Sequence, residues 1–388
     1  MSIACHDLYK TIRFNQDNTL IACASTRGFE IYHVSSVPVG EPSSQFDFKS
    51  PNTHNGSEQG QYAIRLISVL ERTNLMLLVL TSTPSHAYIW DDATRKHIAK
   101  LQFNGDIVGT VFTRQIIGIV LNKRYYLYRF KELQLIKRTE TYDNPLGLAE
   151  LTTNDEDSTF LLASLGDLIG HVHLLSFSLF NGISNYAVSF LAHESSIVAL
   201  QFNKSKHNML CTASARGTIV RVWQVNHLNS SGTVSSGGTR IKAALQYELR
   251  RGIEPTEITS LACQDNFIAV SSLRGTVHVF DISDDNKIHK NVSTVAHSAP
   301  DAKESTSRWH NLFTSMSQGV QTLWKMSTAQ YSSFAKIPCS SGRCIVGFDS
   351  TKRNVLIIVG YDGLVLWVSC ANGQSEIIYS THLRPRPP

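Results

Sequence analysis

Residues 212–225 read TASARGTIVRVWQV: a small and apolar start, a polar turn that ends in glycine, and then an alternating strand. The same arrangement returns in CASTRGFEIYHV (23–34), VSSLRGTVHVFDI (270–282) and VGYDGLVLWVS (359–369). The upstream element repeats too, because SSIVALQFNKSKHNMLCTAS resembles TEITSLACQDNFIAVSS and RCIVGFDSTKRNVLIIVG. This degenerate repeat predicts hairpins between the two middle strands of propeller blades.

Short strand-like runs fill the stretches between these repeats. They are rich in β-branched and aromatic residues and are bounded by turn residues, as in LMLLVLTS (75–82), AYIWDD (87–92), IIGIVLNKRYYLYRF (116–130) and IVALQFN (197–203). Long amphipathic helices are nearly absent. Because all-β folds often run long as one domain, we predict that residues 1–388 form a single all-β domain.

Composition narrows the class of protein. The hydrophobic fraction of 42% is ample for a packed core, and the net charge of +5 fits an anionic partner without indicating nucleic acid. The seven cysteines are scattered without a C-x-x-C pair, which predicts reduced thiols in a cytosolic protein. No apolar run reaches the ~18 residues of a membrane span. We therefore expect any membrane contact to be peripheral.

The spacing of the turn glycines locates two insertions. Gly217 and Gly275 are 58 residues apart, whereas a four-stranded blade takes ~40–45, and the surplus matches a Ser/Gly-rich flexible loop at 226–240. Gly275 and Gly363 are 88 residues apart. The polar segment 283–332 accounts for that surplus and is predicted to be one long loop inside a blade. Loops of such length are usually functional or disordered.

Part of this loop, RWHNLFTSMSQGVQTLWKM (308–326), carries apolar residues on one face of a helix. They are Trp309, Leu312, Phe313, Met316, Val320, Leu323 and Trp324. We predict that this stripe inserts into a bilayer interface, with its tryptophans at headgroup depth. Gly319 weakens the helix by ~1 kcal/mol, so the helix would form on the membrane. The alternative is that the stripe packs on the propeller or binds a partner protein.

A pair of adjacent arginines stands in LQYELRRGIEP (245–255). At the end of a strand, Arg250 and Arg251 would point to opposite sides and serve two neighbouring blades. Similar sets of donors flank them. The earlier blade offers His193, Ser214, Arg216, Thr218 and Arg221, and the later blade offers Ser272, Arg274, Thr276 and His278. Guanidinium, hydroxyl and imidazole donors together suit a multiply phosphorylated headgroup.

Each of these residues also has a structural interpretation. Serine and threonine beside a turn glycine often only cap the hairpin, and His193 is similar to the histidine with which propeller blades bind a neighbouring turn. The spacing Ser-x-Arg-Gly-Thr occurs on both sides of the arginine pair, and this duplication favours binding over capping.

The sequence LRRG (249–252) resembles the F/L-R-R-G signature of the PROPPINs, β-propellers that bind phosphoinositides. Further segments are similar to the family over essentially the whole chain: AYIWDD (87–92), TYDNPLGL (141–148), the TASARGT and SSLRGTVHVF blocks, and YSSFAKI (331–337). Two departures stand out. Leu249 replaces a phenylalanine, which keeps an apolar anchor, and LTSTPSHAY (80–88) replaces a glycine-rich turn, which puts partner contacts on that blade in doubt.

The resemblance implies a seven-bladed, WD40-like propeller with a long membrane-inserting loop in blade six, at 283–332. It implies two sites for phosphatidylinositol 3-phosphate or 3,5-bisphosphate. Arg250 would belong to the first set of donors and Arg251 to the second, with Arg274 the looser assignment. The protein would then recruit autophagy proteins to pre-autophagosomal, endosomal or vacuolar membranes.

Other classes of function remain open on the residues. The main alternative is a soluble propeller scaffold that binds only proteins and uses its arginines in structural ion pairs. An enzyme is less favoured because no G-x-S-x-G, P-loop or zinc-spaced set occurs, so no catalytic residue, metal or cofactor is expected. Nucleic-acid binding is disfavoured because no basic-aromatic stripe appears.

Overall fold

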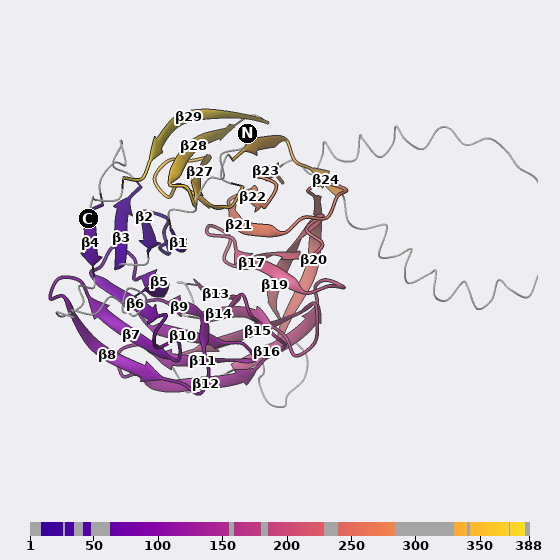
Figure 1. The fold of residues 1–388 in the computed structure, drawn as a ribbon. Helices are drawn as coiled ribbons and strands as arrows, with labels where there is room; N and C mark the ends of the chain where they lie inside the picture. Colours follow the sequence, from indigo (N-terminus) through magenta and orange to yellow (C-terminus); the bar gives the residue numbers. More distant parts are fainter. Residues whose placement is uncertain are drawn as a thin grey trace, which may run out of the picture.

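The structure is a computed structural model that describes residues 9–25, 28–34, 42–47, 63–154, 159–179, 185–228, 240–283, 330–339, 342–371 and 373–384. The described residues form seven sheets, which stand around a central axis as the blades of a propeller (Figure 1). No helix occurs among them. The first and last sheets meet where the Asn18 side chain donates to the Phe348 carbonyl at 2.8 Å, which closes the ring. The prediction of an all-β, seven-bladed propeller is confirmed.

We number the sheets in chain order. Sheet one consists of β1 (Thr11–Phe14), β2 (Leu20–Ala24), β3 (Gly28–His33) and β4 (Ser44–Asp47). Sheet two consists of β5 (Ile64–Val69), β6 (Leu75–Leu80), β7 (His86–Asp91) and β8 (Lys96–Gln102). Sheet three consists of β9 (Ile107–Phe112), β10 (Ile116–Leu121), β11 (Arg124–Arg129) and β12 (Gln134–Glu140). Sheet four consists of β13 (Ala149–Asn154), β14 (Thr159–Leu165), β15 (His171–Ser178) and β16 (Asn185–Leu191).

The remaining sheets follow the same plan with one addition. Sheet five consists of β17 (Ile197–Phe202), β18 (Met209–Ser214), β19 (Ile219–Leu228), β20 (Arg240–Arg250) and β24 (Gln330–Ser332). Sheet six consists of β21 (Ile258–Gln264), β22 (Phe267–Ser272), β23 (Thr276–Asp281) and β25 (Ala335–Pro338), and sheet seven of β26 (Cys344–Phe348), β27 (Val355–Gly360), β28 (Leu364–Ala371) and β29 (Gln374–His382).

Burial explains why the strands read differently in sequence. Second strands such as β10, β18 and β27 are buried along their whole length, because neighbouring sheets cover both of their faces. Such strands read as continuous apolar runs rather than as alternating ones. The outermost strands β8 and β29 are largely exposed and carry mostly polar residues.

The predicted glycine hairpins do join the two middle strands of their blades. Gly217 turns β18 into β19 with φ 62°, and Gly275 turns β22 into β23 with φ 69°. A Cβ on Gly217 would lie 1.8 Å from the carbonyl oxygen of Thr256, in the segment that leads into β21. Each of these turns thus lies against the chain that begins the next blade, and only glycine fits there.

The long predicted loop lies between the third and fourth strands of sheet six, β23 and β25. Most of it, residues 284–329, lies outside the described residues. Its last residues differ from the expectation of a loop, because Gln330–Ser332 form β24 and pair in parallel with the end of β20. Tyr331 is buried against Tyr247 of β20 with ring centroids 5.1 Å apart, and this contact explains the extra strand.

The predicted Ser/Gly-rich loop at 226–240 is shorter at both ends than expected. Asn226 to Leu228 complete β19, and Arg240 begins β20. Residues 229–239 lie outside the described part of the chain.

Candidate functional site

The two predicted donor sets meet at one end of sheets five and six. Because the strands are antiparallel, the β18–β19 turn (215–218), the end of β20 and the β22–β23 turn (273–275) all lie on the same face. The segment 251–257 crosses this face from β20 to β21. The arginine pair therefore stands between the two sets, as the spacing predicts.

The two arginines have different surroundings. Arg250 is exposed, whereas Arg251 is only 8% exposed. The Nε of Arg251 donates to the Gly217 carbonyl at 2.5 Å, and its Nη2 donates to the Glu254 carbonyl at 2.5 Å. Desolvation lowers the pKa of Arg251, and Arg274 lowers it further while Glu254 opposes the change. Arg251 thus ties the β18–β19 turn to the segment 251–257.

The first set contains donors that nothing in the described chain occupies. Arg216 and Arg250 are exposed, and their side chains make no hydrogen bond or ion pair with any described residue. The Thr218 hydroxyl, half-buried beside them, is likewise unoccupied within the described ranges. Ile219 pairs with Arg250 in the ladder, so the turn with Arg216 and Thr218 adjoins the end of β20. These three side chains are available to an anion.

Two other members of the first set are engaged within sheet five. Arg221 donates to the Glu248 carboxylate at 2.8 Å and to the Ala192 carbonyl at 2.7 Å. Ser214 is only 6% exposed at the end of β18. A role for either as a phosphate ligand stays a prediction.

His193 is held inside the sheet. Its Nε2 lies 2.9 Å from the Thr212 hydroxyl, which also accepts a hydrogen bond from the Trp223 indole at 2.9 Å. Burial, with Arg221 nearby, lowers the pKa of His193 to about 3. This chain of contacts joins the segment before β17 to β18 and β19. It gives His193 a structural role, but with a strand residue as the partner of its side chain rather than the neighbouring turn expected from sequence. Its role as a ligand is still only predicted.

The second set is arranged around β23. Ser272 is fully buried and donates to the Thr276 carbonyl at 3.5 Å, and Arg274 forms a close ion pair with Glu254. His278 is 5% exposed, with Nδ1 3.1 Å from the Ser333 hydroxyl. The half-buried Thr276 hydroxyl has no partner within the described part of the protein, as with Thr218 in the first set.

Sequence reasoning missed Lys336 and Ser333. Lys336 lies opposite His278 in the β23–β25 ladder, is exposed, and has no partner among the residues described. Burial lowers the pKa of His278 to about 4, with Arg251 and Lys336 adding to the effect. Arg251 and Lys336 are therefore both close enough to affect the imidazole of His278. The run 331–337 resembles a strand in sequence, but that pattern does not indicate which strand it pairs with.

Among the residues that the structure describes, this face carries three exposed cations whose side chains are unpaired: Arg216, Arg250 and Lys336. Arginine forks and nearby hydroxyls are the donors that recognise phosphate oxygens. A phosphate beside His278 would also raise the pKa of that imidazole, since an opposite charge favours the protonated form. The arrangement suits a phosphorylated ligand that contacts both blades.

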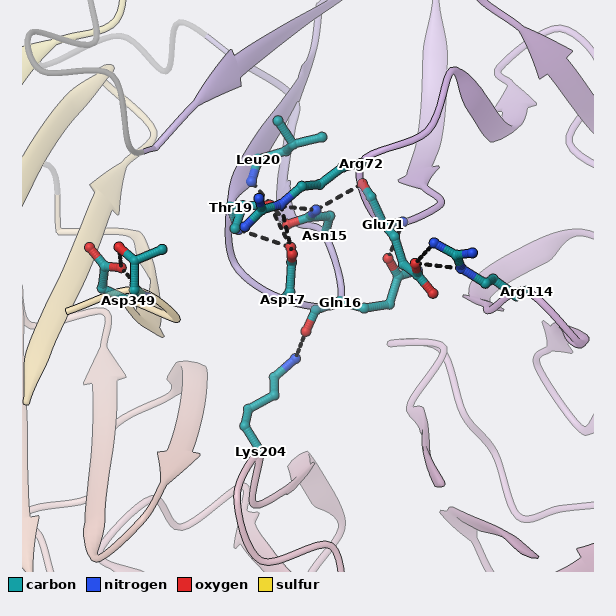
Figure 2. A network of polar contacts seen from close by, with 11 residues as sticks. Asn15, Gln16, Asp17, Thr19, Leu20, Glu71, Arg72, Arg114, Lys204 and Asp349 are labelled. Atoms are coloured by element: carbon teal, nitrogen blue, oxygen red, sulfur yellow. Dashed lines mark hydrogen bonds and ion pairs between the residues drawn. The ribbon is translucent and has the colours of Figure 1, made fainter. Parts of the chain in front are cut away.

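A cavity of about 900 Å³ along the propeller axis is the other candidate. Its lining includes turns at the opposite end of the strands, where Lys204 of the β17–β18 turn contacts the Gln16 carbonyl (Figure 2). Arg72 pairs there with Asp17 at 3.1 Å, and Arg114 pairs with Glu71 at 2.6 Å. Since Lys204, Arg72 and Arg114 already have partners, this network offers an anion no free donor from these three cations.

Inside the cavity, Glu150 is the principal acid. Burial raises the pKa of Glu150 to about 7, against the opposing effect of Lys204 and Arg13. Charges of both signs therefore compensate one another here, and the cavity is a weaker candidate for anion binding than the blade boundary.

Several sequence predictions concern residues or features elsewhere. The apolar stripe from Trp309 to Trp324 lies outside the described residues. Within the described ranges, no helix is long and apolar enough to cross a bilayer, and no cluster of three metal-ligating side chains occurs. The six described cysteines are buried, and none of them forms a disulfide with another described cysteine.

Comparison with known proteins places these features in a family. A family model described as PROPPIN matches residues 8–297, well over half of the chain. SVP1-like protein 2 of Pichia angusta is 29% identical over 278 residues, which cover 70% of this chain and 69% of the relative. Autophagy-related protein 18 of Caenorhabditis elegans is 28% identical over 282 residues, covering 71% of this chain but only 61% of that protein.

Solved structures support the fold. The structure of Kluyveromyces lactis Hsv2 has a TM-score of 0.65 at 18% identity and covers 96% of this chain and 98% of that one. A chain in the complex of KlAtg21 with the coiled coil of AgAtg16 has a TM-score of 0.67 at 19% identity, covering 97% of this chain and 99% of that one. The resemblance inferred from sequence is confirmed.

Proposed function

Since this chain belongs to the PROPPIN family, we propose that it is a peripheral membrane effector that binds phosphatidylinositol 3-phosphate or 3,5-bisphosphate. The first headgroup would lie near Arg216, Thr218 and Arg250, and the second near Thr276 and Lys336. The remaining members of the two predicted sets would line or support these positions. Binding would place the propeller on autophagic, endosomal or vacuolar membranes.

One observation carries the proposal. The exposed side chains of Arg216, Arg250 and Lys336 lie on two adjacent blades and have no hydrogen-bond or ion-pair partner among the described residues. A half-buried threonine hydroxyl without a partner accompanies them in each blade, at the position that follows the turn glycine. This repeated combination supports a pair of phosphate sites rather than one irregular basic patch.

Two weak headgroup sites on the same face of the propeller can together bind a membrane tightly. Once the first headgroup is bound, the second binding step becomes effectively intramolecular and avidity rises. Each basic residue near an anionic surface adds ~1 kcal/mol. The stripe at 309–324 would add an inserting element, by the sequence interpretation.

Recruitment of proteins is the other half of the proposal. KlAtg21, whose fold this chain shares, is seen in complex with the coiled coil of AgAtg16. We infer that blades away from the headgroup sites are free to bind proteins of the autophagy machinery. The lipid would then determine on which membrane that assembly forms.

The test is co-sedimentation with vesicles that contain or lack phosphatidylinositol 3-phosphate. Wild type is compared with the double variant Arg250→Thr/Arg251→Thr, and circular dichroism follows the fold of each. Binding that needs the lipid and is lost in a folded variant supports the proposal. Unchanged vesicle binding by the double variant would refute it.

A protein-only scaffold is the second candidate, and one observation favours it. The hydrogen bonds from Arg251 to the carbonyl oxygens of Gly217 and Glu254 give that arginine a structural role without any ligand. A scaffold predicts that the double variant unfolds rather than leaving the membrane. Substituting Arg250 alone separates the candidates, because Arg250 has no such role.

A further inference from the structure

Two exposed aliphatic side chains stand at the blade boundary and take no part in the headgroup sites. Ile253 is 84% exposed and Leu273 is 46% exposed. Ile253 lies in the segment 251–257, and Leu273 lies at the β22–β23 turn. Glu254 follows Ile253 and Arg274 follows Leu273, and the ion pair between Glu254 and Arg274 joins the two segments.

The segment that carries Ile253 is held firmly. The Arg251 guanidinium donates to the carbonyl of Glu254, the residue after Ile253, and to the carbonyl of Gly217 in the β18–β19 turn of sheet five. The Thr256 amide donates to the Arg216 carbonyl at 3.4 Å, and the Leu273 amide donates to the Glu257 carbonyl at 3.0 Å. An isoleucine presented by a fixed turn loses little conformational freedom when it binds, which favours association.

The charges around Ile253 indicate what covers it. Arg216, Arg250 and Lys336 are exposed and unpaired among the described residues, whereas the nearest acid, Glu254, is paired with Arg274. Glu257 is the other exposed acid of the segment. An apolar tip within a mostly cationic rim is complementary to a bilayer surface, which is anionic at headgroup depth and apolar just beneath it.

We propose that Ile253, with Leu273 beside it, is an apolar anchor that enters the interface of an anionic bilayer between the two headgroup sites. This proposal rests on the proposed function and names an element of it that is independent of the segment 283–332. The anchor fixes the depth and tilt at which the blade boundary meets the lipid. It adds affinity for a membrane but none for a headgroup in solution.

The experiment separates the membrane from the headgroup. Wild type, Ile253→Ser and Leu273→Ser are compared with Ile98→Ser, a matched control on β8 of sheet two whose isoleucine is 54% exposed. Each protein is titrated with vesicles of phosphatidylcholine, phosphatidylserine and phosphatidylinositol 3-phosphate, and separately with soluble dibutanoyl phosphatidylinositol 3-phosphate. Thermal melting confirms that all variants remain folded.

We expect Ile253→Ser to weaken vesicle binding about five- to tenfold and to leave the affinity for the soluble headgroup unchanged. Leu273→Ser should show the same pattern with a smaller loss, and Ile98→Ser should match wild type in both assays. The anchor is refuted if Ile253→Ser and Ile98→Ser bind vesicles alike, the result expected if a protein covers Ile253. It is also refuted if Ile253→Ser loses affinity for the soluble headgroup. Failure of wild type to bind either lipid form would instead refute the proposed function.

Discussion

Substituting the two adjacent arginines one at a time should separate stability from binding. Arg251→Thr removes a guanidinium that is 8% exposed and donates to the carbonyls of Gly217 and Glu254 at 2.5 Å each. Hydrogen bonds that involve a charged group are worth ~1.5–3 kcal/mol each. Relief of the unfavourable burial of a cation offsets part of that loss. We expect Arg251→Thr to lower the free energy of unfolding by ~2–4 kcal/mol.

Arg250→Thr should behave differently, because this exposed side chain has no partner within the described structure. Surface changes of this kind stay within ~0.5 kcal/mol. The assay is thermal and urea unfolding of Arg250→Thr, Arg251→Thr and the matched control Arg251→Lys, which keeps the charge but loses the fork. Arg251→Lys should be intermediate. Equal stability of Arg250→Thr and Arg251→Thr would refute the inference that Arg251 holds the turn.

Further predictions concern the turns, the sheet interior and pH. Gly217→Ala places a Cβ 1.8 Å from the Thr256 carbonyl at φ 62° and should cost ~2–4 kcal/mol of unfolding free energy, whereas Gly252→Ala, with nothing within 4 Å, should leave the thermal midpoint almost unchanged. Thr212→Val removes the shared partner of His193 and Trp223 and should cost ~1–3 kcal/mol; a variant as stable as wild type would contradict the role of that hydroxyl. Burial lowers the pKa of His193 to about 3 and that of His278 to about 4, from 6.5. Their stabilising contribution is therefore complete above pH ~6.5 and is lost as pH falls through the folded values, so His278→Gln should flatten the decline in thermal midpoint between pH 6.5 and 4.

Three of the four hairpins that the sequence revealed have turns that demand glycine. Gly217, Gly275 and Gly363 all have positive φ, so a visible residue type marks each turn. The blades between residues 35 and 190 lack that mark in part. The turn before β7 uses Thr83, Pro84 and Ser85 instead of glycine, and so the repeat is faint there although the sheets form equally well.

The site was foreseen to the extent that it depends on local spacing. Alternation at the end of β20 predicts that Arg250 and Arg251 point to opposite sides, and in the structure Arg250 is exposed while Arg251 is buried; their roles as ligands of two headgroups stay predictions. That alternation does not reveal the bond from Arg251 to the Gly217 carbonyl, because Gly217 lies in a turn 34 residues earlier in the chain. Lys336 was missed for the same reason, since its pairing with His278 spans the long segment 284–329. Non-local pairing of this kind leaves no periodic signal in a single sequence.

The central claim is that two headgroups bind at one blade boundary, and counting them tests it most directly. Calorimetric titration of the protein with soluble dibutanoyl phosphatidylinositol 3-phosphate gives the number of ligands bound per chain. Our account predicts two ligands for wild type and one for Arg250→Thr, with Lys336→Glu weakening the ligand that Arg250→Thr retains. One ligand for wild type that survives Arg250→Thr unchanged, or no binding at all, would contradict the account.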